Sequence, residues 1–219
     1  MENWFSIPTK ENLEAIIFDL DGTLIHTAPE YRYELLGKIL KTLGVENWKR
    51  EDVDEFWFGH SRSRIVSSRF NVKPEEFWAV YDRTENISAR KKYVRLYSDT
   101  KFVEMVKKRG FKTGIVTGSP RAIAEMEVDL IGKELFDMMV IARDSEGIKG
   151  KPDPEGLNYC MEKLDVEAKN AIYVGNGEED VLAARSAGVF DVLIDRGEYG
   201  IKEASLIIKT LFELKQLLE

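Results

Sequence analysis

The sequence is poor in cysteine. Cys160 is the only cysteine among 219 residues, so the chain can form no internal disulfide and no metal site built from several cysteines. Such sparing use of cysteine is typical of proteins in a reducing compartment, and it predicts a cytoplasmic location. We expect Cys160 itself to be a small buried apolar side chain rather than a reactive thiol.

The sequence also lacks a surplus of positive charge and any long apolar run. Lys and Arg number 32 against 39 Asp and Glu, which gives a net charge of −7. Nucleic-acid-binding proteins normally carry a basic surplus, so this class is disfavoured. No stretch approaches the roughly 18 apolar residues of a membrane span, and the first residues do not resemble a secretion signal. We therefore expect neither a nucleic acid nor a membrane as a partner.

The composition is that of an ordinary globular protein, with 43% hydrophobic and 32% charged residues. From residue 98 onward, short apolar runs alternate with segments of helical periodicity. This alternation predicts an α/β fold with a Rossmann-like parallel sheet that helices cover on both faces. The predicted strands are 112–117, 138–142, 171–174, 192–194 and 206–208, and the predicted helices are 101–109 (capped by Asp99), 121–132, 154–163, 179–187 and 210–218.

Residues 26–97 follow a different pattern, because apolar side chains recur there at helical spacing and no convincing strand is present. We expect the aromatic residues of this segment to form the core of a helical bundle, with the lining of a substrate pocket as the weaker alternative. These aromatic residues are Trp48, Phe56, Trp57, Phe77, Trp78 and Tyr81. The predicted domains are an α/β core of residues 1–25 and 98–219 and an inserted all-helical domain of residues 26–97.

Polar side chains follow several of the predicted strands. In an open parallel sheet, ligands bind beyond the carboxyl ends of the strands. We therefore expect carboxylates, a hydroxyl, an ammonium and a carboxamide to meet at one edge of the sheet. The residues concerned are Asp19 and Asp21, Thr117-Gly118-Ser119, Lys151, and the run Gly175-Asn176-Gly177-Glu178-Glu179-Asp180.

The acidic pair after the first strand indicates a metal ion. Asp19 and Asp21 point the same way on an extended chain. Two like charges about 4 Å apart cost on the order of 4 kcal/mol near a protein surface. A hard divalent cation reverses the sign of this term, and oxygen ligands suit Mg²⁺. Gly22 would allow a tight turn, and Thr23 would offer an N-cap hydroxyl.

A phosphoryl group fits this predicted site. Mg²⁺ and Lys151 would offset its charge, the Thr117 hydroxyl and nearby backbone N–H groups would bind its oxygens, and a carboxylate would attack it. We include three further residues of the same edge among the candidates for substrate binding: Thr23, Gly118 and Ser119.

Four ordered motifs make the sequence similar to the haloacid dehalogenase superfamily, in the branch of phosphoglycolate phosphatase and β-phosphoglucomutase. They are DLDGT after an apolar strand, a strand-terminal Thr117, Lys151 followed by Pro152, and G-N-x-x-x-D from 175 to 180. The resemblance covers residues 15–195. It implies that Asp19 is the nucleophile, Asp21 the general acid and base, Thr117 a ligand of the phosphoryl oxygens and Lys151 the group that screens Asp19. It also implies that residues 26–97 form a mobile cap.

The resemblance places Mg²⁺ on the Asp19 carboxylate, the Asp21 backbone carbonyl and the side chains of Asn176 and Asp180. The sequence departs from the family here, because Asn176 stands where an acid is usual. A neutral amide oxygen can still coordinate Mg²⁺, but with lower affinity. In the predicted cap, Gly59 to Ile65 resemble a loop with which related caps touch the far end of the substrate. Arg62 would then face an anionic group.

The sequence leaves several activities open. The first is hydrolysis of a small phosphorylated metabolite by a monomer or homodimer, and a phosphomutase would use the same residues. A haloacid dehalogenase needs no metal and does not require Asp21, so the presence of Asp21 counts against it. A non-catalytic phospho-acceptor module also uses acids, Thr and Lys on a parallel sheet, but such modules are shorter and lack an insertion of some seventy residues.

Overall fold

The structure, a computed structural model, describes residues 7–9, 11–59, 62–197 and 203–218. The chain divides into two compact units, residues 1–26 with 96–219 and residues 27–95. It leaves the first unit through β2 (Ile25–Thr27) and returns through β3 (Val94–Leu96), and these two strands pair with each other. The expectation that 26–97 contains no strand was wrong, because three-residue strands are too short to show an alternating pattern.

The first unit contains a six-stranded parallel sheet in the order β5-β4-β1-β6-β7-β8. The α/β class and the parallel sheet predicted from the sequence are therefore confirmed. The strands are β1 (Ala15–Phe18), β4 (Lys112–Thr117), β5 (Met138–Ile141), β6 (Ala171–Gly175), β7 (Phe190–Ile194) and β8 (Leu206–Ile208).

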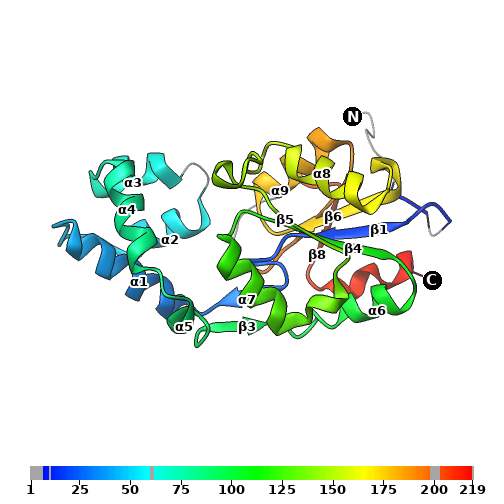
Figure 1. Cartoon of the computed structure of the whole chain (residues 1–219), viewed down its shortest axis with the longest axis horizontal. Helices are drawn as coiled ribbons and strands as arrows, with labels where there is room; N and C mark the ends of the chain where they lie inside the picture. The colour runs from blue at the N-terminus through cyan, green and yellow to red at the C-terminus, as the bar shows by residue number, and fades with distance from the viewer. Residues whose placement is uncertain (1–6, 10, 60–61, 198–202, 219) are drawn as a thin grey trace. The chain divides into compact units, whose positions relative to one another are not determined.

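Helices cover both faces of this sheet, with α8 and α9 on one side and α6 and α7 on the other (Figure 1). The predicted closing helix is instead a 3-10 helix, η4 (Leu211–Leu217). The α-helices are α6 (Phe102–Lys108), α7 (Arg121–Ile131), α8 (Glu155–Leu164) and α9 (Glu178–Ala187), and shorter 3-10 turns are η1 (Lys133–Leu135), η2 (Asp144–Glu146) and η3 (Ala168–Asn170).

Close packing of α8 on β4 explains the environment of the single cysteine. Cys160 is fully buried in the core. A Cβ atom on Gly114 would lie 2.7 Å from its sulfur, so only glycine allows the helix to approach the strand this closely. Burial raises the pKa of the Cys160 thiol to about 12. The thiol therefore stays protonated, and the prediction of a buried apolar side chain is confirmed.

The described part of the second unit is a bundle of five helices: α1 (Pro29–Thr42), α2 (Arg50–Phe58), α3 (Arg62–Phe70), α4 (Pro74–Thr84) and α5 (Ile87–Arg90). Phe56 and Phe77 are buried in its core with ring centroids 5.1 Å apart. Trp48, Trp57, Trp78 and Tyr81 pack against the same core, which confirms that these aromatic residues stabilise the bundle. In the described part of the chain, no helix has the length and apolar character needed to cross a membrane.

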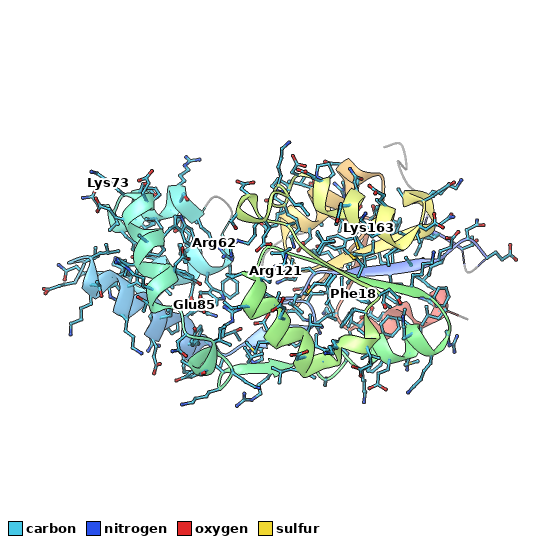
Figure 2. All side chains as sticks on the ribbon, in the orientation of Figure 1. Phe18, Arg62, Lys73, Glu85, Arg121 and Lys163 are labelled. Atoms are coloured by element: carbon cyan, nitrogen blue, oxygen red, sulfur yellow. The ribbon has the colours of Figure 1, made fainter. Side chains whose placement is uncertain are left out.

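The register of the sheet brings distant parts of the sequence to one edge. Phe18, the last residue of β1 (labelled in Figure 2), lies opposite Ile115 of β4 and Val174 of β6. The backbone N–H of Asp19 continues the ladder by donating to the Val174 carbonyl at 2.8 Å. The residues that follow β1, β4 and β6 therefore emerge together at the carboxyl edge.

Candidate active site

Asp19 lies at the centre of this edge. It follows β1 directly, and its side chain is 7% exposed. Its Oδ1 accepts a hydrogen bond from Lys151 Nζ at 2.6 Å, and its Oδ2 accepts one from the Thr23 hydroxyl at 3.2 Å. Each carboxylate oxygen therefore has one donor from the protein, which fixes the orientation of the side chain.

Lys151 links Asp19 to the last of the predicted motifs. Its ammonium lies 2.6 Å from Asp19 Oδ1, 2.6 Å from Asp180 Oδ1 and 3.2 Å from the Tyr173 hydroxyl. The side chain is 6% exposed. Because an ammonium carries three N–H groups, all of them have a partner here. The charge of Lys151 is thus held between two buried carboxylates.

Asp180, in the first turn of α9, uses both of its oxygens within the protein. Oδ1 accepts from Lys151 and lies 3.0 Å from the Tyr173 hydroxyl. Oδ2 accepts from the backbone N–H groups of Asn176 at 3.1 Å and Gly177 at 2.9 Å. A carboxylate offers about four lone-pair sites, so these four contacts fill them. The arrangement anchors the lysine to the start of a helix.

The turn after β1 brings Asn176 beside Asp19. Gly22 has a φ of +79°, and a Cβ atom there would lie 2.0 Å from Asn176 Nδ2, so this position requires glycine. The Thr23 hydroxyl lies 3.2 Å from Asp19 Oδ2 and 3.5 Å from Asn176 Oδ1. No helix begins at this turn. The expectation that Thr23 caps a helix was wrong, because its hydroxyl faces these two side chains instead.

Asp21, Thr117 and Ser119 form a second group at the same edge. The Ser119 hydroxyl donates to the Asp21 carboxylate, and the Ser119 backbone N–H donates to the Thr117 hydroxyl at 3.1 Å. Thr117 is 1% exposed, whereas Asp21 and Ser119 are half-buried and Gly118 is exposed. The two loops after β1 and β4 are therefore in direct contact.

The pKa values of Asp19 and Lys151 are shifted from their ordinary values. Burial raises the pKa of Asp19 from 3.8 to about 7; the Lys151 ammonium opposes this rise, and the charge of Asp180 adds to it. Burial also opposes the charge on Lys151, but Asp180 and Asp19 outweigh it and hold the pKa of the ammonium well above its usual value. A buried carboxyl group with a pKa raised in this way needs a further positive charge nearby to stay ionised at neutral pH.

The pKa of Asp19 predicts a pH dependence of folding stability. Because Asp19 binds its proton more tightly in the folded protein, its contribution to stability is largest below about pH 4 and is lost as the pH rises to 7. A pKa rise of this size corresponds to about 4 kcal/mol. In EDTA, wild type should therefore lose stability relative to Asp19→Asn between pH 4 and pH 8, as measured by urea unfolding. Asp129→Asn, an exposed change on α7, keeps Asp19, so its stability should differ from that of wild type by a constant amount over this pH range. A constant difference between wild type and Asp19→Asn would contradict the prediction.

The donor set fits a hard cation, although it is not a cluster of acids. Among the described residues, no group of three or more His, Cys, Asp or Glu side chains is placed to hold a metal ion. Two of the predicted ligands, the Asn176 carboxamide and the Asp21 backbone carbonyl, do not belong to these four side-chain types. Asp19 Oδ2 and Asn176 Oδ1 both lie within hydrogen-bond reach of one hydroxyl, and both offer oxygen. Oxygen donors of this kind suit Mg²⁺.

Arg62 lies in the helical unit, at the start of α3 (Figure 2). Its guanidinium donates to the Trp57 carbonyl at 3.1 Å and lies 5.8 Å from the centre of the Phe56 ring. His60 and Ser61 of the predicted substrate loop lie outside the described residues. The role of Arg62 toward a substrate stays a prediction.

Two residues of the site region were missed from the sequence. Tyr173 was assigned only to a buried strand, although the hydroxyl of a buried tyrosine needs a partner, and here it contacts Lys151 and Asp180. Arg196 follows β7 (Phe190–Ile194) at the same edge of the sheet, where the sequence motifs predicted no site residue. It binds Asp99, so the prediction that Asp99 caps a helix was wrong; α6 begins at Phe102 without a side-chain cap.

The chain is similar to one known protein family and to known sequences. Residues 16–194 match the family model of haloacid dehalogenase-like hydrolases. The chain is 34% identical over 181 residues to pyrophosphatase PpaX of Bacillus cereus, which covers 80% of each sequence.

Solved structures share the fold. A phosphoglycolate phosphatase candidate from Lactobacillus plantarum matches with a TM-score of 0.79 at 22% identity, over 94% of this chain and 99% of that chain. β-Phosphoglucomutase from Clostridium difficile matches with a TM-score of 0.72 at 21% identity, over 94% and 97%. A phosphatase candidate and a mutase thus resemble the chain about equally, so the fold does not choose between the two reactions.

Proposed function

The chain belongs to the haloacid dehalogenase-like hydrolase family, and on this basis we propose that it is a Mg²⁺-dependent phosphatase acting on a small phosphorylated metabolite through an aspartyl-phosphate. One observation supports this most strongly: a buried carboxylate at the end of β1, Asp19, lies 2.6 Å from the Lys151 ammonium. Hydroxyl groups of neighbouring loops surround the same edge of the sheet.

In the first half of the reaction, an Asp19 oxygen attacks phosphorus. The new O–P bond forms as the bond between phosphorus and the leaving oxygen breaks, and Asp21 gives that oxygen its proton. The Ser119 hydroxyl, which donates to Asp21, orients this carboxyl group. The Thr117 hydroxyl and the backbone N–H groups of its loop bind the phosphoryl oxygens.

In the second half, water attacks the phosphorus of the aspartyl-phosphate while Asp21 takes up a proton from it. The bond between Asp19 and phosphorus breaks, and inorganic phosphate is released with Asp19 restored. Lys151 offsets the negative charge on the transferring group in both halves. Asp180 keeps the ammonium in place, since its remaining oxygen is fixed by two backbone N–H groups.

In this proposal the Asp19 carboxylate, the Asp21 backbone carbonyl and the Asn176 side-chain oxygen hold Mg²⁺. When bound, the ion stabilises ionised Asp19 and offsets phosphoryl charge. Asp180 was also predicted as a ligand. Because its lone-pair sites are filled by Lys151, Tyr173 and two N–H groups, we assign it to the positioning of Lys151, and coordination would require the loss of one of these bonds.

Asn176→Asp should tighten Mg²⁺ binding. The new carboxylate would add a negative charge beside Asp19 in a site where the present side chain is neutral, and we expect at least about a tenfold lower Kd, or about 1.4 kcal/mol. Isothermal titration of the metal-free protein measures this directly. Asn158→Asp, which adds the same charge at an exposed position of α8, should leave the Kd unchanged. An unchanged or weaker Kd in Asn176→Asp would show that the ion is held elsewhere.

A screen for released phosphate tests the proposed function. Phosphorylated metabolites, including phosphoglycolate, sugar phosphates and inorganic pyrophosphate, are incubated with the protein with and without Mg²⁺. Pyrophosphate is included because the relatives that are 34% identical are pyrophosphatases by name. We expect Mg²⁺-dependent release from at least one compound, and no release from any of them would refute the proposal.

The mutase alternative shares every named residue. It predicts that a sugar phosphate is converted to its isomer with little free phosphate, and ³¹P NMR of the same reactions distinguishes the two outcomes. Transfer of the phosphoryl group to water, with release of inorganic phosphate, supports the phosphatase.

A further inference from the structure

A buried ion pair lies beside the site and takes no part in the proposed reaction. The Arg196 guanidinium binds Asp99 through two bonds, Nη1 to Oδ2 at 2.9 Å and Nη2 to Oδ1 at 3.0 Å. The two side chains are 8% and 5% exposed. The guanidinium also stacks on Tyr97, with its carbon 3.9 Å from the ring centre. Arg196 is therefore held in one orientation from two sides.

This orientation directs Arg196 at the turn that carries the candidate site. Its Nη2 donates to the Thr23 backbone carbonyl at 2.6 Å. The side chain of the same residue, Thr23, reaches Asp19 and Asn176 through its hydroxyl. One residue thus connects the buried guanidinium on one side with the predicted nucleophile and the predicted metal ligand on the other.

The carbonyl group of the next residue, Leu24, is held by the chain segment that contains Tyr97 and Asp99. The Leu24 carbonyl accepts from the Thr100 hydroxyl at 2.6 Å and from the Tyr97 backbone N–H at 3.2 Å. Asp99, between these two residues, receives a further bond from the Leu211 backbone N–H at 2.8 Å. The turn after β1 is therefore fixed by residues 97–100 and by Arg196, all of which belong to the first unit.

We infer that Arg196 is a positioning residue for the reaction proposed above: by holding the Thr23 carbonyl, it keeps the Thr23 hydroxyl on Asp19 and Asn176. The inference rests on the proposed function. Small displacements of a reacting group lower rates strongly, by about a hundredfold for a shift of about 1 Å. Loss of the guanidinium should therefore lower kcat while substrate binding changes little.

Two variants of Arg196 test this inference. Arg196→Met removes the charge and the donors, and Arg196→Lys keeps the charge but replaces the planar fork by one ammonium. Amide hydrogen exchange is measured for residues 22–25, whose N–H groups bond within the turn, together with kcat and KM on the substrate found in the screen. We expect exchange in the turn to accelerate at least about tenfold and kcat to fall about ten- to a hundredfold, with KM little changed. If Arg196→Met does not fold, the same measurements on Arg196→Lys test the inference.

Arg185→Met is the matched control. Arg185 also binds a buried carboxylate, Asp191, at 3.3 Å and a backbone carbonyl at 3.5 Å, but neither of these bonds goes to the turn. It should change neither kcat nor exchange in residues 22–25. If the Arg196 variants resembled this control in both measurements, the inference about Arg196 would be overturned, but the proposed function would not. A wild-type protein that releases no phosphate from any compound would overturn the proposed function and this inference together.

Discussion

Asp19→Asn is expected to abolish Mg²⁺-dependent hydrolysis of an aryl phosphate while leaving the fold intact. Asparagine has the same shape and keeps one oxygen as a hydrogen-bond acceptor, but its amide is not a nucleophile. Removal of a nucleophile costs on the order of 10⁴-fold or more in kcat. The measurement is the release of p-nitrophenol from p-nitrophenyl phosphate, with circular dichroism to verify folding.

The control for this change is Asp129→Asn, which removes an exposed carboxylate of α7 and should retain full activity. Acid-quenched reactions provide a second readout, because wild type should carry covalently bound phosphate and Asp19→Asn should carry none. Retained activity in a folded Asp19→Asn protein would refute the assignment of the nucleophile. A wild-type aspartyl-phosphate that persists for minutes would instead favour the phospho-acceptor alternative.

Lys151→Met is expected to damage both activity and stability. The ammonium lies 2.6 Å from Asp19 Oδ1 and from Asp180 Oδ1, and the residues Asp19 and Asp180 are 5% and 3% exposed. Removal of the cation leaves two buried charges unpaired, which typically costs about 3–5 kcal/mol. Urea unfolding at pH 8 in EDTA measures this loss. The loss should be smaller at pH 5, where protonation of Asp19 relieves the repulsion.

The same change should lower kcat by at least about a hundredfold, because the Lys151 ammonium no longer offsets the charge of the transferring group. Lys149→Met is the matched control. Lys149 lies two residues before Lys151 in the same loop; its side chain is 69% exposed, and its ammonium lies 3.4 Å from Asp153 Oδ2. Loss of such a surface pair changes stability by less than about 1 kcal/mol. If Lys151→Met were as stable and active as Lys149→Met, the proposed role of the buried lysine would be wrong.

The order of the elements was predictable because each depends on a local pattern. The strand predicted at 112–117 is β4, and the helix predicted at 121–132 is α7, which ends at Ile131. The short strands β2 and β3 were not predicted, since three residues show no periodicity. Residues 210–218 have a helical pattern of apolar side chains, which did not predict the helix type, and the chain forms a 3-10 helix over Leu211–Leu217.

The candidate site was predictable to the level of strand ends. Apolar runs separated by helices imply a parallel sheet, and a parallel sheet collects the residues after its strands at one edge. Asp19 and Thr117 could be placed there without any coordinates. Asp99 could not, because an aspartate before a helical run fits an N-cap equally well. Its partner Arg196 lies 97 positions further along the chain.

Hydrophobic periodicity fixes the strands and the parallel arrangement fixes their common end, so the order of residues alone predicted that the candidate site side chains, such as Asp19, Thr117 and Lys151, reach the edge of the sheet. How these groups pair became visible only in the folded protein. Lys151 bridges Asp19 and Asp180, and Arg196 holds the Thr23 carbonyl across a separation of 173 residues. Such bonds depend on the register and packing of whole strands and helices, which bring distant atoms within 3 Å of each other, and no local pattern in the sequence encodes that distance.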